Sequence, residues 1–266
     1  MRARILTAIV LAAVLIAVLL YGPKWAPRAL FGLFIAAGAW EWAAFLPLSA
    51  RPARMAYVLL VALLAMAGRV WFADVHQFSA LMEASACWWL VALLWLLLAP
   101  QRTRAWSTAL AGLLALVPAG VALTRVAEAW PRGAQWVLFI LTLTFAADTG
   151  AFIVGRTCGR VKLAPQVSPG KTWEGVLGGM LFATGVGFAG SRWFSLPPGG
   201  FVPLCLAGAA FSVVGDLTES MFKRGAGLKD SGRLFPGHGG VLDRVDGVLA
   251  ALPVMCLGLL WLGVGA

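Results

Sequence analysis

The chain has 266 residues, of which 61% are hydrophobic and only 12% are charged, and its formal net charge is +10. Soluble domains average about 45–50% apolar and about 25% charged residues, so this chain cannot cover a soluble surface with polar side chains. The composition excludes a large extramembrane domain, a disordered chain and a nucleic-acid reader. It is typical of an all-α, polytopic membrane protein whose loop lysines and arginines supply the positive charge.

Nine apolar runs follow one another along the chain, each close to the roughly 20 residues that a membrane-spanning helix needs. Helices are expected because they satisfy their backbone groups within the segment. The expected spans are residues 5–20, 29–48, 55–72, 81–99, 105–123, 135–154, 175–194, 201–216 and 245–264. The first run could be a cleaved signal peptide, but the second follows almost at once, which favours a retained span.

The loop charges predict the orientation of these spans. With the N-terminus in the cytoplasm, 15 of the 21 lysines and arginines fall on the inner side and 6 on the outer side. Positive loops favour the cytoplasmic side, so the predicted topology is about nine transmembrane helices, N-in/C-out.

The acidic residues are unevenly distributed. The first 135 residues hold four of them, whereas seven lie between Asp148 and Asp246. We therefore expect residues 1–134 to form a transmembrane scaffold of about five helices. Residues 135–266 are expected to form a catalytic transmembrane region of about four helices with two cytoplasmic loops.

The densest polar pattern is the segment 220–246, SMFKRGAGLKDSGRLFPGHGGVLDRVD. Asp243 and Asp246 are three residues apart, so they share one face if the ninth helix has begun. Asp216 lies at the cytoplasmic end of the eighth run. Because acidic residues at a membrane edge are costly and are functional by default, we expect Asp216, Asp243 and Asp246 to hold a hard cation such as Mg²⁺ together with substrate phosphate oxygens.

Asp216 also begins a polar stripe. Asp216, Glu219, Ser220 and Lys223 follow the spacing of one helical face. A polar helix end with a Glu219–Lys223 surface pair would account for the same spacing without any ligand. The functional interpretation gains support because Asp216 and the two later aspartates lie on the helices that flank one loop.

A second polar segment covers residues 148–175 and contains a Gly-Lys-Thr sequence. It is not a P-loop, because Pro165 stands where the first glycine of that motif should be. Instead, Ser168 is expected to cap a helix whose first position is Pro169, with Lys171 and Thr172 in the first turn. Such a helix start is a good anion site; the alternative is a capped helix start without a ligand.

Three further polar residues stand apart in the sequence. Asp148, in or at the end of the sixth run, is either the partner of a nearby cation or a ligand-facing acid. His238 lies among glycines and is either a substrate contact or a structural histidine. Glu41, between Trp40 and Trp42, is interpreted as a helix-packing or charge-pairing residue outside the site.

Cations and metal-binding acids at a cytoplasmic membrane edge suggest a phosphate-rich soluble substrate that meets a lipid. The corresponding reaction class is phosphoryl or nucleotidyl transfer, whose main needs are charge neutralisation and positioning.

These residues resemble the phosphatidate cytidylyltransferase, or CDP-diacylglycerol synthase, family. Segment 220–246 is similar to the family's C-terminal pattern of Ser, Lys-Arg, Lys-Asp, Gly, Pro-x-His-Gly-Gly and Asp-Arg-x-Asp, and SPGKTWEG and GRTCGRVKLAP upstream also match. The resemblance covers roughly residues 146–246. Phe152–Ile153 stands in place of a tyrosine-containing aromatic pair, and Cys158 in place of a frequent aromatic residue. Neither departure touches a proposed ligand.

The resemblance implies a multi-pass enzyme of the bacterial inner membrane with its active site facing the cytoplasm. It would join CTP and phosphatidic acid into CDP-diacylglycerol and pyrophosphate. The family uses Mg²⁺, with a potassium ion implicated beside it, and tends to form homodimers. The implied partners are therefore CTP, phosphatidic acid, the bilayer and a second copy of the chain, with no nucleic acid.

The resemblance also assigns roles to the polar residues. Basic and hydroxyl side chains would hold the triphosphate and the lipid phosphate, and the aspartates would hold the metal. The expected catalytic residues are Asp216, Lys223, Arg224, Lys229, Asp230, Asp243 and Asp246. The expected substrate-binding residues are Asp148, Ser168, Lys171, Thr172, Glu174, Ser220, His238 and Arg244.

Two other functions fit part of the pattern. A CTP-dependent lipid-alcohol kinase would use the same metal chemistry but transfer the γ-phosphate and release CDP, and the full 220–246 pattern is not expected in it. A transporter for a phosphorylated solute would carry ionisable residues near the bilayer midplane and on both faces, whereas the acids here gather on one face.

Overall fold

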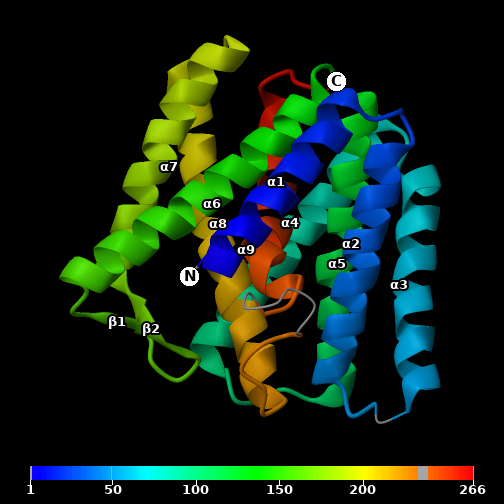
Figure 1. Cartoon of the computed structure of the whole chain (residues 1–266), viewed down its shortest axis with the longest axis vertical. Helices are drawn as coiled ribbons and strands as arrows, with labels where there is room; N and C mark the ends of the chain where they lie inside the picture. The colour runs from blue at the N-terminus through cyan, green and yellow to red at the C-terminus, as the bar shows by residue number, and fades with distance from the viewer. Residues whose placement is uncertain (1, 49, 233–238, 266) are drawn as a thin grey trace. The chain divides into compact units, whose positions relative to one another are not determined.

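Helices account for nearly all of the regular structure. The computed structural model describes residues 2–48, 50–232 and 239–265. Within these ranges each apolar run corresponds to one α-helix (Figure 1). The helices are α1 (Arg2–Tyr21), α2 (Ala26–Trp42), α3 (Arg51–Trp71), α4 (Val75–Leu98), α5 (Ala105–Ala129), α6 (Gly133–Cys158), α7 (Trp173–Phe194), α8 (Pro198–Gly225) and α9 (Leu242–Trp261), with a short 3₁₀ helix, η1 (Ala43–Phe45), after α2. The all-α class is confirmed.

Six of the described helices are long and apolar enough to cross a bilayer: α3, α4, α5, α6, α8 and α9. They contain 20 to 28 residues and have a mean hydropathy of 1.6 to 2.0. At about 1.5 Å rise per residue, 20 residues span the roughly 30 Å hydrocarbon core. The chain is therefore a multi-pass membrane protein, while the count of nine spans and the N-in/C-out orientation stay predictions.

The chain groups into two compact units, each built from separate stretches of sequence. Unit 1 consists of Met1–Leu81, Arg102–Leu138 and Phe222–Val245, and unit 2 of Met82–Gln101, Phe139–Met221 and Asp246–Ala266. The polar C-terminal motif is thus divided, because its central part belongs to unit 1 and its two ends belong to unit 2. The functional division of the chain at residue 134 stays a prediction.

In unit 1, α2, α3 and α5 pack side by side (Figure 1). Two buried aromatic residues join them through their polar atoms. Trp42 Nε1 donates to the carbonyl of Thr108 at 2.8 Å, and the Tyr57 hydroxyl donates to the carbonyl of Ala109 at 2.9 Å. A Cβ at Gly112 would overlap both aromatic side chains. The small residue therefore lets α5 approach closely, as is common where helices pack in membranes.

In unit 2, a β-hairpin joins α6 to α7 (Figure 1). Strand β1 (Lys162–Ala164) pairs antiparallel with β2 (Ser168–Thr172). Past the hairpin, α6 and α7 approach through glycines: a Cβ at Gly150 would lie 2.6 Å from the carbonyl oxygen of Gly178, and one at Gly178 would lie 2.7 Å from that of Gly150. This contact fixes the direction of the two helices that carry the hairpin.

The predicted helix start at Ser168 is wrong. Pairing with β1 holds residues 168–172 extended, and α7 begins only at Trp173. Thr172 is its N-cap, because its side chain accepts a hydrogen bond from the Gly175 amide at 3.1 Å. Lys171 and Thr172 therefore precede the helix and do not lie in its first turn.

Candidate active site

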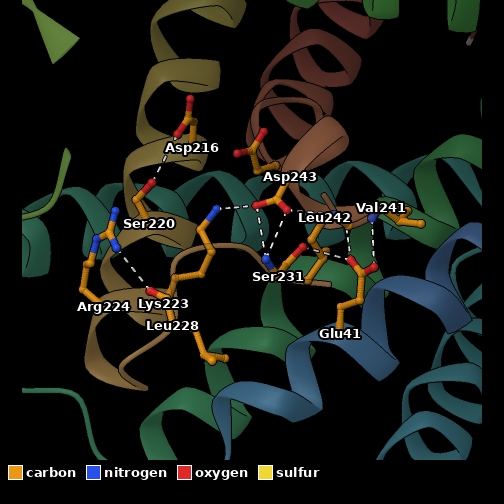
Figure 2. A network of polar contacts seen from close by, with 12 residues as sticks. Glu41, Asp216, Ser220, Lys223, Arg224, Leu228, Ser231, Val241, Leu242 and Asp243 are labelled. Carbon is orange, nitrogen blue, oxygen red and sulfur yellow. Dashed lines mark hydrogen bonds and ion pairs between the residues drawn. The ribbon is translucent and has the colours of Figure 1, made fainter. Parts of the chain in front are cut away.

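The polar stripe on α8 is helical throughout, as its spacing predicts. The helix continues from Asp216 to Gly225 instead of ending near Asp216. The Ser220 hydroxyl donates to Asp216 Oδ1 one turn away at 3.4 Å (Figure 2). These residues lie in the last third of the helix, so their side chains are placed by regular backbone geometry.

Lys171 pairs with Asp216 inside unit 2. The distance from Lys171 Nζ to Asp216 Oδ2 is 2.5 Å, and both side chains are partly solvated. An ion pair with this exposure contributes at most about 1 kcal/mol to stability. The pair nevertheless brings a cation from the end of β2 onto the acidic face of α8. Three of the predicted site residues, Lys171, Asp216 and Ser220, are therefore in contact.

A second acidic group in unit 2 surrounds Asp246. This buried side chain interacts electrostatically with Asp216 and with the buried Glu219, so three carboxyl groups lie close together. A Cβ at Gly215 would overlap the backbone carbonyl of Asp246, so α8 and α9 approach closely there. Like charges repel strongly where solvation is poor. A hard cation with oxygen ligands would relieve that repulsion, and this donor set fits Mg²⁺.

The three aspartates expected to bind the metal do not form one ready-made cluster among the described residues. Over residues 2–48, 50–232 and 239–265, no group of three or more His, Cys, Asp or Glu side chains is arranged as a metal site. Asp216 and Asp246 belong to unit 2, while Asp243 has other partners in unit 1. Mg²⁺ needs only one or two carboxylates when substrate phosphates complete its shell, so Asp216 and Asp246 of unit 2 fit metal binding that depends on the substrate.

Asp243 organises the polar centre of unit 1. It lies in the first turn of α9, which begins three residues earlier than the predicted span. Lys223 Nζ lies 2.6 Å from its Oδ1, and the amides of Gly240 and Ser231 donate to its Oδ2 at 2.8 and 3.1 Å (Figure 2). Both members of the ion pair are nearly buried. The aspartate therefore holds the end of α8, the Ser231 backbone and the start of α9 together.

Glu41 on α2 is the residue whose part in this centre was not predicted. Its Oε1 accepts a hydrogen bond from the Val241 amide at 2.9 Å, and its Oε2 accepts from the Leu242 amide at 2.8 Å and the Ser231 hydroxyl at 3.0 Å (Figure 2). The observed donors are neutral groups on the turn before α9, not a cation. The sequence showed only a carboxylate within an apolar run. Such a carboxylate needs hydrogen-bond donors when it is buried, but the sequence does not say which ones.

The other predicted residues of unit 1 lie at its surface. Arg224 is exposed and donates to the Leu228 carbonyl at 3.3 Å. Lys229 and Asp230 are exposed in the turn after α8, and Arg244 is exposed on α9. His238 lies outside the described residues.

In unit 2, Asp148 is exposed on α6, and Ser168 is half-buried at the start of β2. Glu174, in the first turn of α7, accepts a hydrogen bond from the Val161 amide at 3.1 Å. The structure thus connects Glu174 to the hairpin, next to Thr172.

Comparison with known proteins gives a consistent result. Residues 2–261 match the model of the Cytidylyltransferase family. A phosphatidate cytidylyltransferase of Pseudomonas aeruginosa is 40% identical over 274 residues, covering 98% of this chain and 97% of the relative. One of Haemophilus influenzae is 39% identical, covering 95% and 96%. One of Brucella suis is 45% identical over 128 residues, 48% of this chain and 47% of the relative.

The match takes in every helix from α1 to α9 and all the polar contacts described above. The chain belongs to the cytidylyltransferase family.

Proposed function

We propose that this protein transfers the cytidylyl group of CTP to phosphatidic acid, giving CDP-diacylglycerol and pyrophosphate for phospholipid synthesis. The observation that carries this function is the similarity, over nearly the whole chain, to two proteins named phosphatidate cytidylyltransferase. The Lys171–Asp216 pair in unit 2 and the Lys223–Asp243 pair in unit 1 each support it, because the reaction joins two anions and needs nearby cations.

The carboxylates Asp216, Asp243 and Asp246 would hold Mg²⁺, with a potassium ion as a second candidate. Asp216 and Asp246 are the better placed, since both belong to the crowded acidic group of unit 2. Asp243 would have to share oxygens that already accept hydrogen bonds from Lys223 and two amides. When bound, the metal would neutralise phosphate charge and stabilise the departing pyrophosphate.

Basic and hydroxyl side chains would bind the phosphates. In unit 2, Lys171 lies at the end of the hairpin, next to the N-cap of α7. In unit 1, Lys223 is fixed by its ion pair, whereas Arg224 and Lys229 are exposed to solvent. The remaining proposed contacts are Asp148, Ser168, Thr172, Glu174, Ser220, Asp230, His238 and Arg244.

The chemistry makes modest demands on these residues. A phosphate oxygen of phosphatidic acid, already anionic, bonds to the α-phosphorus of CTP. The bond from that phosphorus to the oxygen bridging to the β-phosphate breaks, and pyrophosphate leaves with the bonding electrons. No strong general base is required, so positioning and charge neutralisation are the main contributions of the protein.

The proposed location is the bacterial inner membrane, with the active site on the cytoplasmic side and the chain as a homodimer. The excess of lysine and arginine in the predicted inner loops supports this orientation. The acyl chains of the lipid need no polar pocket, because they can stay in the bilayer.

A product assay tests the function. Purified protein receives α-labelled CTP, phosphatidic acid and Mg²⁺, and label in lipid is followed together with pyrophosphate. We expect the wild type to form labelled lipid and pyrophosphate in equal amounts. The control variant Glu128→Gln, which changes a carboxylate paired with Arg28, should do the same. Asp246→Asn should make neither product. In a parallel assay with a lipid alcohol, conversion of CTP to CDP with transfer of the γ-phosphate to the alcohol would identify a kinase instead. No turnover by a folded wild type would favour a transporter.

A further inference from the structure

Glu41 is a buried carboxylate whose two oxygens both accept hydrogen bonds from the start of α9 and the residue before it. Its side chain is 5% exposed and accepts three hydrogen bonds. Two of the donors are the amides of Val241 and Leu242, which no earlier carbonyl of α9 can reach because they open the helix. Glu41 therefore caps α9 from a different helix, 200 residues away in sequence.

The glycines beside these donors show how closely the carboxylate is surrounded. A Cβ at Gly240 would overlap Glu41 Oε2 and the Ser231 hydroxyl, and one at Gly232 would overlap Glu41 Oε1. Backbone without side chains is thus wrapped around the carboxylate on both sides. Such enclosure leaves little space for the side chain to take another position.

The same backbone stretches also hold Asp243. The amides of Ser231 and Gly240 donate to Asp243. The Ser231 hydroxyl and the amides of Val241 and Leu242 donate to Glu41 (Figure 2). Two carboxylates therefore fix one turn from opposite directions. One of them, Asp243, also holds Lys223 at 2.6 Å.

We propose that Glu41 is a positioning residue for the reaction: it fixes the turn before α9 so that Asp243 and Lys223 are in place before substrate arrives. This inference deepens the proposed function and rests on it. Glu41 touches no reacting group itself. It acts through Ser231 and the first amides of α9, so its loss should reduce the fraction of molecules that are ready to bind CTP.

Glutamine is the informative substitution because it keeps the size of the side chain. A carboxylate only accepts hydrogen bonds, whereas an amide carries one NH₂ group that only donates. In Glu41→Gln this NH₂ must face the Val241 amide or the Leu242 and Ser231 donors. At least one buried amide then loses its acceptor, so the turn loosens without a cavity being formed.

The first test separates KM from kcat. When the binding-competent fraction falls, the apparent dissociation constant rises by the same factor. Leaving one buried donor without an acceptor predicts a rise of about 10-fold in the KM for CTP, with kcat changed less than about 3-fold. Glu128→Gln makes the same chemical change at the Arg28 ion pair of unit 1 and should leave both constants unchanged.

The second test needs no catalysis. Hydrogen exchange at the amides of Val241 and Leu242 should be faster in Glu41→Gln than in the wild type. If Glu41→Gln does not fold, Ser231→Ala takes its place, because it removes one donor to Glu41 and keeps the backbone bond to Asp243. It should raise the KM for CTP about 3-fold.

The outcomes are distinguishable. A folded Glu41→Gln with unchanged KM and unchanged exchange at the two amides would overturn the inference, whether or not kcat falls. If Glu41→Gln does not fold, an unchanged KM for CTP in Ser231→Ala would overturn the inference. A wild type that makes no CDP-diacylglycerol would instead contradict the proposed function, while the exchange measurement would still test the role of Glu41.

Discussion

The ion pair between Lys223 and Asp243 should be the most valuable single electrostatic contact in unit 1. Its atoms are 2.6 Å apart, and the two side chains are only 9% and 12% exposed. Removing one partner of a buried pair typically costs about 3–5 kcal/mol, because the other charge is left uncompensated. Asp243 would keep its hydrogen bonds from the amides of Ser231 and Gly240. Lys223→Met should therefore lower the unfolding free energy by about 3 kcal/mol, the lower end of this range.

A double-mutant cycle isolates this pair. Reversible unfolding in mixed micelles is measured for Lys223→Met, Asp243→Asn and the double variant. We expect the double variant to be more stable than the sum of the single losses by about 2 kcal/mol, since neither charge is left alone. Arg28→Met, which removes a cation from the exposed pair with Glu128, should have little effect. Additivity within about 0.5 kcal/mol would refute the reasoning.

Three further predictions concern other parts of the chain. Lys171→Met should lower the unfolding free energy by at most about 1 kcal/mol, because the ion pair of Lys171 is partly solvated. It should reduce kcat/KM for CTP by about 10- to 100-fold, because a hydrogen bond from a charged group to the substrate is lost. A loss of stability without a loss of activity would contradict a phosphate-binding role. Gly240→Ala should destabilise by about 1–3 kcal/mol through overlap, whereas Gly185→Ala on α7 meets no atom within 4 Å and should not, as thermal unfolding of both would reveal. The hydrogen bond from the His76 amide holds the pKa of Asp74 below its ordinary value of 3.8, so the ionised carboxylate stabilises the fold above that pH and this stabilisation is lost as pH falls through the lowered pKa. The difference in unfolding free energy between the wild type and Asp74→Ala should therefore disappear in acid. A difference that does not change with pH would contradict this prediction.

The helices were predictable because membrane burial leaves few choices. A run of about 20 apolar residues must satisfy its backbone internally, so hydropathy located α1 to α9, and six of these helices are long and apolar enough to cross a membrane. The polar motif was predictable for a related reason: acids such as Asp216 and Asp246 are too costly near a membrane to be incidental. What hydropathy could not locate were the ends of helices, such as the extension of α8 from Asp216 to Gly225.

The errors arose where a distant partner decides the local structure. Ser168-Pro169 suits the start of a helix, but proline is also accepted at a strand edge. Pairing with Lys162–Ala164 decides for the strand. The donors of Glu41 could not be predicted for the same reason, because most of them are backbone amides, which leave no mark on the sequence. A composition-based argument can say that such a carboxylate needs donors, but not which ones.

The cap that Glu41 places on α9 has a consequence for biosynthesis. Val241 follows Glu41 by 200 residues. Because ribosomes add about 5–20 residues per second, the amides that donate to Glu41 are synthesised about 10–40 s after α2. A nascent chain that stops before Ser231 contains the carboxylate but none of its donors. Release of an incomplete chain would leave a carboxylate without donors in the apolar helix α2. Quality-control proteases could use this defect to distinguish it from the finished enzyme.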